Sequence, residues 1–428
     1  MKWQLGLGRE NGLAFWGLLF IEGSFGAFFP IWPLYMQELG APIAIVGLLL
    51  ALGGVFRLFV LLPTARISSA IGSRRLLLWS RVISAIGIGS AALAPSWPWL
   101  IPVMVGSAIG SMAFPLLLAH VSANALEGQR VRAFSIIVTI GPSIALLIAP
   151  LISSALIQIF GLRAPFLLSA AFSLMSVVVL SRISQEAAEQ IDEETSDVQP
   201  ARGYRAVIRN IPVRNLLILK LFTIFALGLG TQLVPNYLRD VGNYTDARIS
   251  LFSAFSAIGT IAFGTLVVRN RRFAAAPMLG AALAVSLVSV GYILFLVPEV
   301  LALVVIAFLF RGGMFASISL FSAVLGEMAP ARDREHIFTV SELVIVAGFS
   351  FAPLVAGLLY GFDPSLPLIV SAAAGVPVIA VLLRMGFARR QDDAGPPAQQ
   401  ATILVTGPDP GSVVVEELPA SDVSNGTE

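Results

Sequence analysis

The feature that most constrains this chain is a series of about a dozen apolar segments, each close to the ~20 residues that a helix needs to cross a ~30 Å hydrocarbon core. Hydrocarbon cannot hydrogen-bond an unpaired backbone group, and the segments lack the alternation of barrel strands, so they must be helices. We therefore predict an all-α integral membrane protein with twelve transmembrane helices. Their approximate spans are residues 13–36, 43–65, 75–94, 98–121, 134–158, 164–182, 215–237, 247–268, 274–297, 300–325, 337–360 and 366–387.

The composition agrees with this class and excludes several others. Hydrophobic residues make up 57% of the chain and charged residues 12%, whereas about a quarter of a soluble globular chain is charged. The net charge of +2 is too small, and the charges too scattered, for a nucleic-acid surface. Because the sequence has no cysteine and only two histidines, we predict no metal site and no cofactor.

Arginine is distributed unequally between the two sides that these spans define. With the N-terminus in the cytoplasm, the outer loops hold only Arg163, Arg239 and Arg248. The inner side then holds Lys2, Arg9, Arg74, Arg75, Arg130, Arg132, Arg182, Arg202, Arg205, Arg209, Arg214, Arg269, Arg271, Arg272, Arg332, Arg334, Arg389 and Arg390. This excess predicts a cell-membrane protein with both termini in the cytoplasm.

Two polar stretches suggest how the chain is divided. Residues 183–213 are first acidic and then basic, which is typical of a cytoplasmic linker lying near anionic lipid. We predict a six-helix bundle in residues 1–182, this linker, and a second six-helix bundle in residues 214–388. Residues 389–428 are rich in Pro, Gly, Asp and Ser, which predicts a disordered cytoplasmic tail, although its runs ATILVT and SVVVEEL are β-prone.

The two halves resemble each other in sequence. Residues 33–40 read PLYMQELG and residues 235–242 read PNYLRDVG, an offset of 202. Residues 149–152 and 352–355 read APLI and APLV, at an offset of 203. Two matches at nearly one offset, within equivalent hydropathy, predict that a six-helix unit was duplicated.

The loop after the second span resembles a motif of the major facilitator superfamily. That family carries a G-x-L-a-D-R-x-G-R-R pattern here, and the chain matches it at Gly72, Arg74 and Arg75. Ser69 and Ala70 replace the acidic and basic residues of the family's inner gate. The resemblance extends over residues 13–387 and implies two pseudo-symmetric bundles that transport a solute by alternating access.

The fifth span resembles, in a degraded form, a motif of the drug–proton antiporters in this superfamily. Ala145, Ala149, Pro150, Ser153 and Ser154 stand where that motif has G-x-x-x-G-P-x-x-G-G. Small residues and a proline are equally typical of tight helix packing. The resemblance implies gating roles for the following residues: Gly72, Arg74, Arg75, Pro150 and Pro353. The family's helix 4 arginine is missing, since Gly106 occupies its position, while helix 10 offers Arg311 at the corresponding place.

Ionisable side chains within apolar spans are functional candidates because charge in a bilayer is costly. Glu22 and Arg311 fall near the membrane midplane, and Arg57 lies somewhat toward the cytoplasm. Glu22 is interpreted as a proton-binding or substrate-binding carboxylate, with a structural ion pair between Glu22 and Arg57 as the alternative. Four other residues lie near span ends, where we expect contact with interfacial water: Arg81, His120, Lys220 and Glu342.

The family resemblance implies that helices 1, 4, 7 and 10 line the cavity. The lining candidates on these helices are Phe25, Phe29, Ser111, Phe114, Phe225, Gln232 and Phe315. Aromatic stripes more often serve packing than binding, but an apolar cavity with few polar groups favours an amphipathic solute over a sugar.

Three functions remain open. The first is proton-coupled efflux of a lipophilic or amphipathic compound, with protons and membrane lipids as partners and the protein a monomer. The second is uptake or facilitated transport of an anionic or polar metabolite, held by Arg57 and Arg311. The third is a non-transporting receptor derived from a transporter. No nucleophile and base, P-loop or metal-ligand pattern supports an enzyme.

Overall fold

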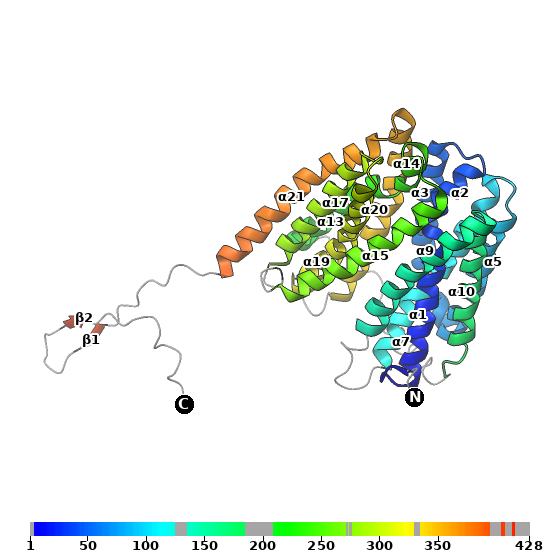
Figure 1. The fold of residues 1–428 in the computed structure, drawn as a ribbon. Coiled ribbons are helices and arrows are strands. Elements are labelled where there is room, and N and C mark those ends of the chain that lie inside the picture. The colour runs from blue at the N-terminus through cyan, green and yellow to red at the C-terminus, as the bar shows by residue number, and fades with distance from the viewer. Residues whose placement is uncertain are drawn as a thin grey trace.

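The computed structural model describes residues 4–124, 135–184, 209–270, 273, 276–328, 334–393, 404–406 and 413–415. Their helices form two bundles, one for each half of the chain (Figure 1). The first bundle contains α1 (Arg9–Phe28), η2 (Phe29–Ile31), α2 (Trp32–Glu38), α3 (Ile43–Leu61), α4 (Thr64–Ile71), α5 (Ser73–Ser90), η3 (Ala91–Leu93), η4 (Trp97–Leu100), α6 (Ile101–Gly110), α7 (Ala113–Ala123), η5 (Ser135–Ile140), α9 (Gly141–Phe160) and α10 (Ala164–Leu180). The second contains α13 (Ile211–Thr231), α14 (Val234–Asp240), α15 (Asp246–Arg269), α17 (Pro277–Phe295), α18 (Leu301–Arg311), α19 (Gly313–Met328), α20 (Arg334–Phe362) and α21 (Leu366–Asp393).

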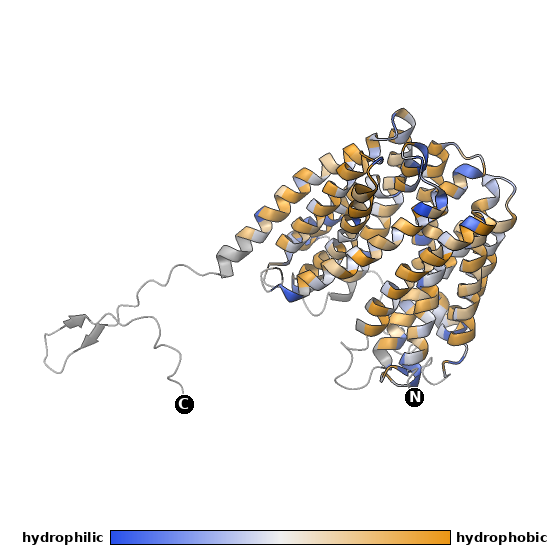
Figure 2. Ribbon diagram, viewed as in Figure 1, coloured by the Kyte–Doolittle hydropathy of each residue, from blue (hydrophilic) through white to orange (hydrophobic). Residues whose placement is uncertain are grey.

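These elements combine into twelve apolar rods. Within the described residues, 11 helices are long and apolar enough to cross a membrane, and the shorter Ala164–Leu180 is the twelfth apolar helix. Hydrophobic residues make up most of the helical ribbon in both bundles (Figure 2). The all-α membrane fold with twelve helices in two pseudo-symmetric bundles is therefore confirmed.

The linker and the tail lie largely outside the described residues. Of the predicted linker, only its two ends are described. Helix α21 continues to Asp393, beyond the predicted start of the tail at residue 389. Strands β1 (Leu404–Thr406) and β2 (Val413–Val415) pair antiparallel and fall within the two runs that the sequence marked as β-prone. The division of the chain into domains remains a prediction.

The bundles meet at one end and diverge toward the end at which the N-terminus lies (Figure 1). We call the side of the membrane with the N-terminus the near side and the opposite side the far side. Helix α3 packs along α20, where glycines allow their backbones to approach. A Cβ atom on Gly47 would lie 2.9 Å from the Cα of Gly357, and Gly54 likewise faces Ser350. Only glycine fits at these two positions of α3.

A second contact between the bundles joins α9 to α15. The Ser154 hydroxyl donates to the carbonyl of Ala247 (2.8 Å), and the Ser250 hydroxyl donates to the carbonyl of Pro150 (3.0 Å). Pro150 has no amide to donate, and the ring of a proline within a helix loosens the local backbone ladder. The equivalent Pro353 lies within α20, where its carbonyl faces Gly47 of α3.

The repeated sequence motifs therefore mark the contacts between the bundles. Pro33 and Pro235 are each the second residue of a seven-residue helix, α2 and α14, which contact each other. Pro150 and Pro353 lie on the equivalent fifth and eleventh membrane helices. This placement is what a duplication of a six-helix unit predicts.

Replacing Gly47 by leucine tests the contact between α3 and α20. We expect Gly47→Leu to destabilise the closed far side by about 1–3 kcal/mol, because the added atoms overlap the backbone of α20. The chain has no cysteine, so spin labels can be placed at P42C in the first bundle and E299C in the second. Pulsed electron paramagnetic resonance should then show a longer distance between the labels.

The matched control lies on the same helix. A Cβ atom on Gly53 would have nothing within 4 Å, so Gly53→Leu should leave the distance unchanged. Equal distances in the two leucine variants would show that the α3 and α20 contact does not hold the far side closed.

Candidate functional site

Four membrane helices are interrupted at positions related by the internal repeat. Between α1 and α2 the interruption is η2, and between α13 and α14 it is the turn at residues 232–233. Helices α6 and α7 are separated at Ser111 and Met112, and helices α18 and α19 at Gly312. Pro30 and Gln232 are 202 residues apart, as are Gly110 and Gly312. Interrupted helices at equivalent places of two repeats indicate a binding site at the repeat interface.

Local sequence explains the interruptions in the fourth and tenth membrane helices. Pro115 cannot donate to the carbonyl of Ser111 and its ring would clash with that group, so the helix breaks there. Gly312 and Gly313 supply the flexible pair that ends α18. The exposed carbonyls are satisfied by side chains, since Arg81 donates to Gly110 (3.3 Å) and Thr260 to Gly312 (3.1 Å).

Three of these interruptions meet at a small pocket between the two bundles. The first bundle contributes Phe29, Pro30, Pro33 and Leu50 to its lining. The second contributes Thr231, Gln232, Pro235, Ile249, Ser253, Phe308 and Arg311. The pocket thus lies directly on the near side of α2 and α14, with an apolar wall and a few polar groups.

Arg311 supplies the charge in this pocket. It is half-buried at the end of α18, and the carbon at the centre of its guanidinium lies 5.5 Å from the centroid of the Phe308 ring. Within the part of the chain that the structure describes, no carboxylate lies within 4 Å of Arg311 and its guanidinium makes no hydrogen bond. The remaining polar candidate, Gln232, stands in the turn after α13, also without a hydrogen bond to a described residue.

The other predicted charges are arranged in a row of alternating sign. Glu22 interacts electrostatically with the cations Arg57 and Arg81. Arg57 interacts electrostatically with both Glu22 and Glu342. Glu342 also interacts electrostatically with Lys220. Arg57 belongs to α3 and Glu342 to α20, so the row passes from one bundle to the other. Among the described residues no ion pair within 4 Å joins Glu22 to Arg57, and a structural pairing of the two residues stays the alternative.

Arg81, Lys220 and His120 are buried, so the prediction that they reach interfacial water is wrong. Arg81 is 4% exposed and donates to the hydroxyls of Ser173 (2.6 Å) and Ser176 (3.3 Å) on α10. Lys220 is fully buried and donates to Ser341 (2.6 Å) and Ser322 (3.1 Å). Serine hydroxyls take the place of water around both cations. The sequence prediction used only the distance of each cation from a helix end, and that distance does not reveal serines on other helices. Serines spaced by four and three residues on α10 were the available signal.

Some of the predicted lining residues line the pocket, and the others lie elsewhere on the same helices. Phe29, Gln232 and Arg311 line the pocket, and Phe25 stacks on Phe29 with 4.3 Å between ring centroids. Phe25 and Phe315 are exposed, while Phe225 packs against a hydrophobic core to which both bundles contribute. Phe114 packs against the core of the first bundle. The hydroxyl of Ser111 donates to Ala108 (2.6 Å) at the break between α6 and α7.

The predicted near-side gate residues connect elements within the first bundle. Gly72 joins α4 to α5 with a φ of 88°, which favours glycine. Arg74 donates to the carbonyl of Ser181 (2.6 Å) at the end of α10, a favourable place for a cation. Arg75 is exposed. This contact of Arg74 joins two helices of one bundle.

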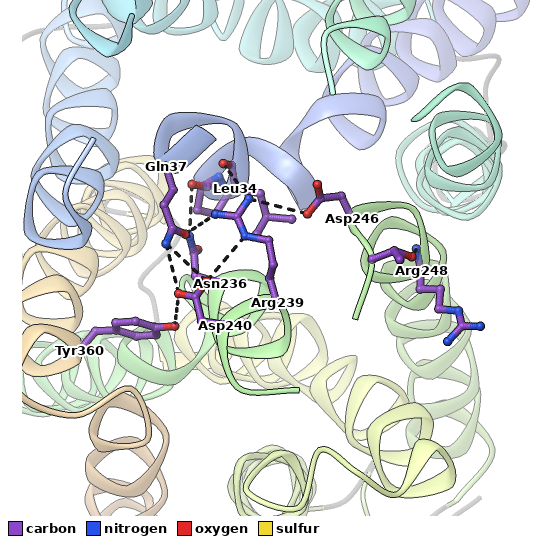
Figure 3. A network of polar contacts seen from close by, with 10 residues as sticks. Leu34, Gln37, Asn236, Arg239, Asp240, Asp246, Arg248 and Tyr360 are labelled. Atoms are coloured by element: carbon purple, nitrogen blue, oxygen red, sulfur yellow. Dashed lines mark hydrogen bonds and ion pairs between the residues drawn. The ribbon is translucent and has the colours of Figure 1, made fainter. Parts of the chain in front are cut away.

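The far side is closed by a polar network that sequence reasoning missed (Figure 3). The carbonyl oxygen of Gln37 accepts hydrogen bonds from Asn236 (2.7 Å) and Arg239 (2.5 Å), and its amide donates to Asp240 (3.2 Å). Tyr360 of α20 also donates to Asp240 (2.9 Å). We call these five residues the far-side latch. One glutamine of the first bundle thus binds three residues of the second.

Further contacts fix the latch in place. Arg239 donates to the carbonyl of Leu34 (3.4 Å) and lies 3.8 Å from the carboxylate of Asp246. Asn236 donates to the carbonyl of Pro33 (3.3 Å). Gln37 and Arg239 occupy the same place in the repeated eight-residue motif, so the available signal was a polar pair inside a repeat.

A membrane protein of two repeat-related bundles, with a polar pocket between them and one closed end, has the architecture of a secondary transporter. A family model of the Major Facilitator Superfamily matches residues 14–323, and the chain belongs to this superfamily. No curated protein sequence matches the chain.

Solved structures share the fold at low sequence identity. A variant of the nucleoside transporter NupG superposes with a TM-score of 0.73 at 15% identity, covering 87% of this chain and 99% of that one. A POT family transporter in complex with 5-aminolevulinic acid gives 0.70 at 15% identity, covering 89% and 96%. The human organic anion transporter MFSD10 gives 0.61 at 14%, covering 87% and 99%.

The far-side latch should control access to the pocket. Gln37→Leu removes its hydrogen bonds across the bundles at similar side-chain volume, which should cost about 1–2 kcal/mol and raise the far-open population roughly tenfold. A cysteine placed in the pocket at S253C should then react roughly tenfold faster with a membrane-impermeant maleimide added on the far side.

A glutamine on the surface of the first bundle provides the control. Gln158 is exposed on α9, so Gln158→Leu makes the same chemical change away from the latch and should leave the reaction rate unchanged. If Gln37→Leu also leaves the rate unchanged, the latch does not close the far side.

Proposed function

We propose that this protein is a secondary active transporter that moves a small amphipathic compound by alternating access, coupled to protons. The observation that carries this proposal is the pocket at which three interrupted helices meet between the bundles. Its lining comes from both bundles, so a rocking motion of one bundle against the other would expose it to each side in turn. The far-side latch and the divergence of the bundles toward the near side correspond to one of the two states.

The orientation of the chain in the membrane decides which state of the transport cycle this conformation represents. The excess of basic residues on the near side supports a near side in the cytoplasm and a location in the cell membrane. The described conformation is then inward-facing, with the extracellular side closed.

Proton coupling is assigned to Glu22. Arg57, which interacts electrostatically with Glu22, lies on α3, and α3 packs against the second bundle. Arg57 also interacts electrostatically with Glu342 of α20. When the bundles move relative to each other, the distances from Arg57 to Glu22 and to Glu342 change. The affinity of Glu22 for a proton then differs between the two states, and proton binding is linked to the conformational equilibrium.

The direction of transport follows from the degraded antiporter motif on α9. Ala145, Ala149, Ser153 and Ser154 are buried around Pro150, where α9 meets α1 and α15. An exchange of outgoing solute for incoming protons fits this resemblance, and we propose efflux. Uptake of an anionic metabolite is the second candidate, favoured by Arg311 in the pocket. Vesicles of both orientations distinguish the two, and binding without flux would identify a receptor.

Replacing Glu22 by glutamine tests the coupling. Glu22→Gln fixes the uncharged form, so pH-gradient-driven accumulation in proteoliposomes should fall to the level of empty liposomes. Exchange of the same compound without a gradient should persist, because glutamine is close in size to glutamate. The assay uses a panel of radiolabelled amphipathic compounds of positive, neutral and negative charge.

A second carboxylate controls for the loss of one charge. Glu299 is exposed between α17 and α18 on the far side, and Glu299→Gln should accumulate the same compounds as the unchanged protein. Full accumulation by Glu22→Gln would make Glu22 structural and would remove the proposed coupling site.

A further inference from the structure

The positive charge of Arg311 is not compensated by the part of the chain that the structure describes. No described carboxylate lies within 4 Å of its guanidinium. Glu22 is not its counter-ion, since no ion pair within 4 Å joins Glu22 to Arg311 among the described residues. An unpaired cation among apolar side chains is costly, so its retention in a pocket indicates that a ligand supplies the opposite charge.

The orientation of the guanidinium agrees with this. The carbon at its centre lies over the Phe308 ring, 5.5 Å from the ring centroid. A guanidinium that stacks on an aromatic face keeps its N–H groups free along its edge. That edge matches the two oxygens of a carboxylate, which arginine binds in a bidentate manner.

One other polar group of the pocket has N–H donors that are free for a ligand. The amide of Gln232 has two N–H groups and no hydrogen bond to a described residue. The Ser253 hydroxyl donates to the carbonyl of Ser250 (2.6 Å), and the Thr231 oxygen is engaged with Tyr292 (2.6 Å). Arg311 and Gln232 are therefore the groups with N–H donors free for a ligand.

An apolar surface lies next to these donors. Phe29 lines the pocket, and Phe25, one helical turn toward the near side, stacks on it and is 40% exposed. A solute whose charged end reaches Arg311 can place an apolar tail along this pair of rings. The pocket is small, so it suits the polar end of such a solute rather than the whole molecule.

We propose that the transported compound is an amphipathic carboxylate, whose carboxylate binds Arg311 and Gln232 and whose apolar tail lies against Phe25 and Phe29. This inference rests on the proposed transport function and names its substrate class. It excludes lipophilic cations as the main substrates, because a second positive charge beside Arg311 is repelled.

A set of probes that differ only at one end tests the substrate class. Benzoate, 4-phenylbutyrate and 8-phenyloctanoate provide three tail lengths, and the corresponding alcohols and amines provide neutral and cationic counterparts. Each is titrated into the purified full-length protein while the melting temperature is followed, because a ligand of the folded state raises it. At least one carboxylate should stabilise the protein, with an apparent affinity about tenfold or more above that of its alcohol and its amine.

Substitutions locate the binding site. Arg311→Gln should weaken carboxylate binding about tenfold or more, and Arg311→Lys should weaken it less because lysine keeps the charge but loses the bidentate geometry. Gln232→Leu keeps the charge and should weaken binding a few-fold, about the loss of one donor. Arg248 is exposed on the far side, so Arg248→Gln removes one arginine from the same bundle and should bind as the unchanged protein does.

The results that overturn the inference are specific. It fails if no carboxylate stabilises the unchanged protein, or if the alcohols or amines bind as tightly. It also fails if Arg311→Gln folds and binds the carboxylate unchanged, or, where that variant does not fold, if Gln232→Leu binds it unchanged. Carboxylate binding without flux in proteoliposomes would refute the transport proposal and leave the anion site standing. Gradient-driven flux of neutral compounds, without carboxylate binding, would refute the anion site and leave the transport proposal standing.

Discussion

The structure depends on one constraint: hydrocarbon offers no hydrogen bonds, so every backbone polar group inside the membrane must find a partner within the protein. This requirement turns the apolar segments into helices. It also makes each interruption of a helix conspicuous, because the freed backbone groups need other donors. Arg81 and Thr260 satisfy the carbonyls of Gly110 and Gly312 at two such interruptions. The protein bears the cost of broken helices at the place where the bundles enclose a pocket.

The same constraint separates the charges that serve packing from those that are free for function. Arg81 and Lys220 are surrounded by serine hydroxyls and are inaccessible from the space between the bundles. Arg311 has no such partners among the described residues. The interface of the bundles has two kinds of contact. Glycines and serines hold α3 to α20 and α9 to α15. The far-side latch is polar, and three of its residues, Gln37, Arg239 and Asp240, are partly or fully exposed. Polar contacts of this kind are weak enough to break in a transport cycle.

Sequence alone predicted the twelve helices and the repeat-related positions of the prolines, because length, hydropathy and the repeat offset can be read directly from the chain. It also selected Arg311, Gln232 and Phe29, since a charge at membrane depth and helical spacing suffice to place them. It missed the far-side latch, because the contact of Gln37 with Asn236 and Asp240 depends on how two bundles dock. It misplaced Arg81 and Lys220, because the serines that solvate them come from other helices.

The most direct test is a crystal structure of the protein with 4-(4-bromophenyl)butanoate, in which anomalous scattering locates the bromine. The account predicts a bromine peak beside Phe25 and Phe29, and carboxylate density at the guanidinium of Arg311, with the far-side latch closed over both. Bromine peaks confined to the lipid-facing surface, or a carboxylate bound away from Arg311, would contradict the claim that the interrupted helices form the binding site.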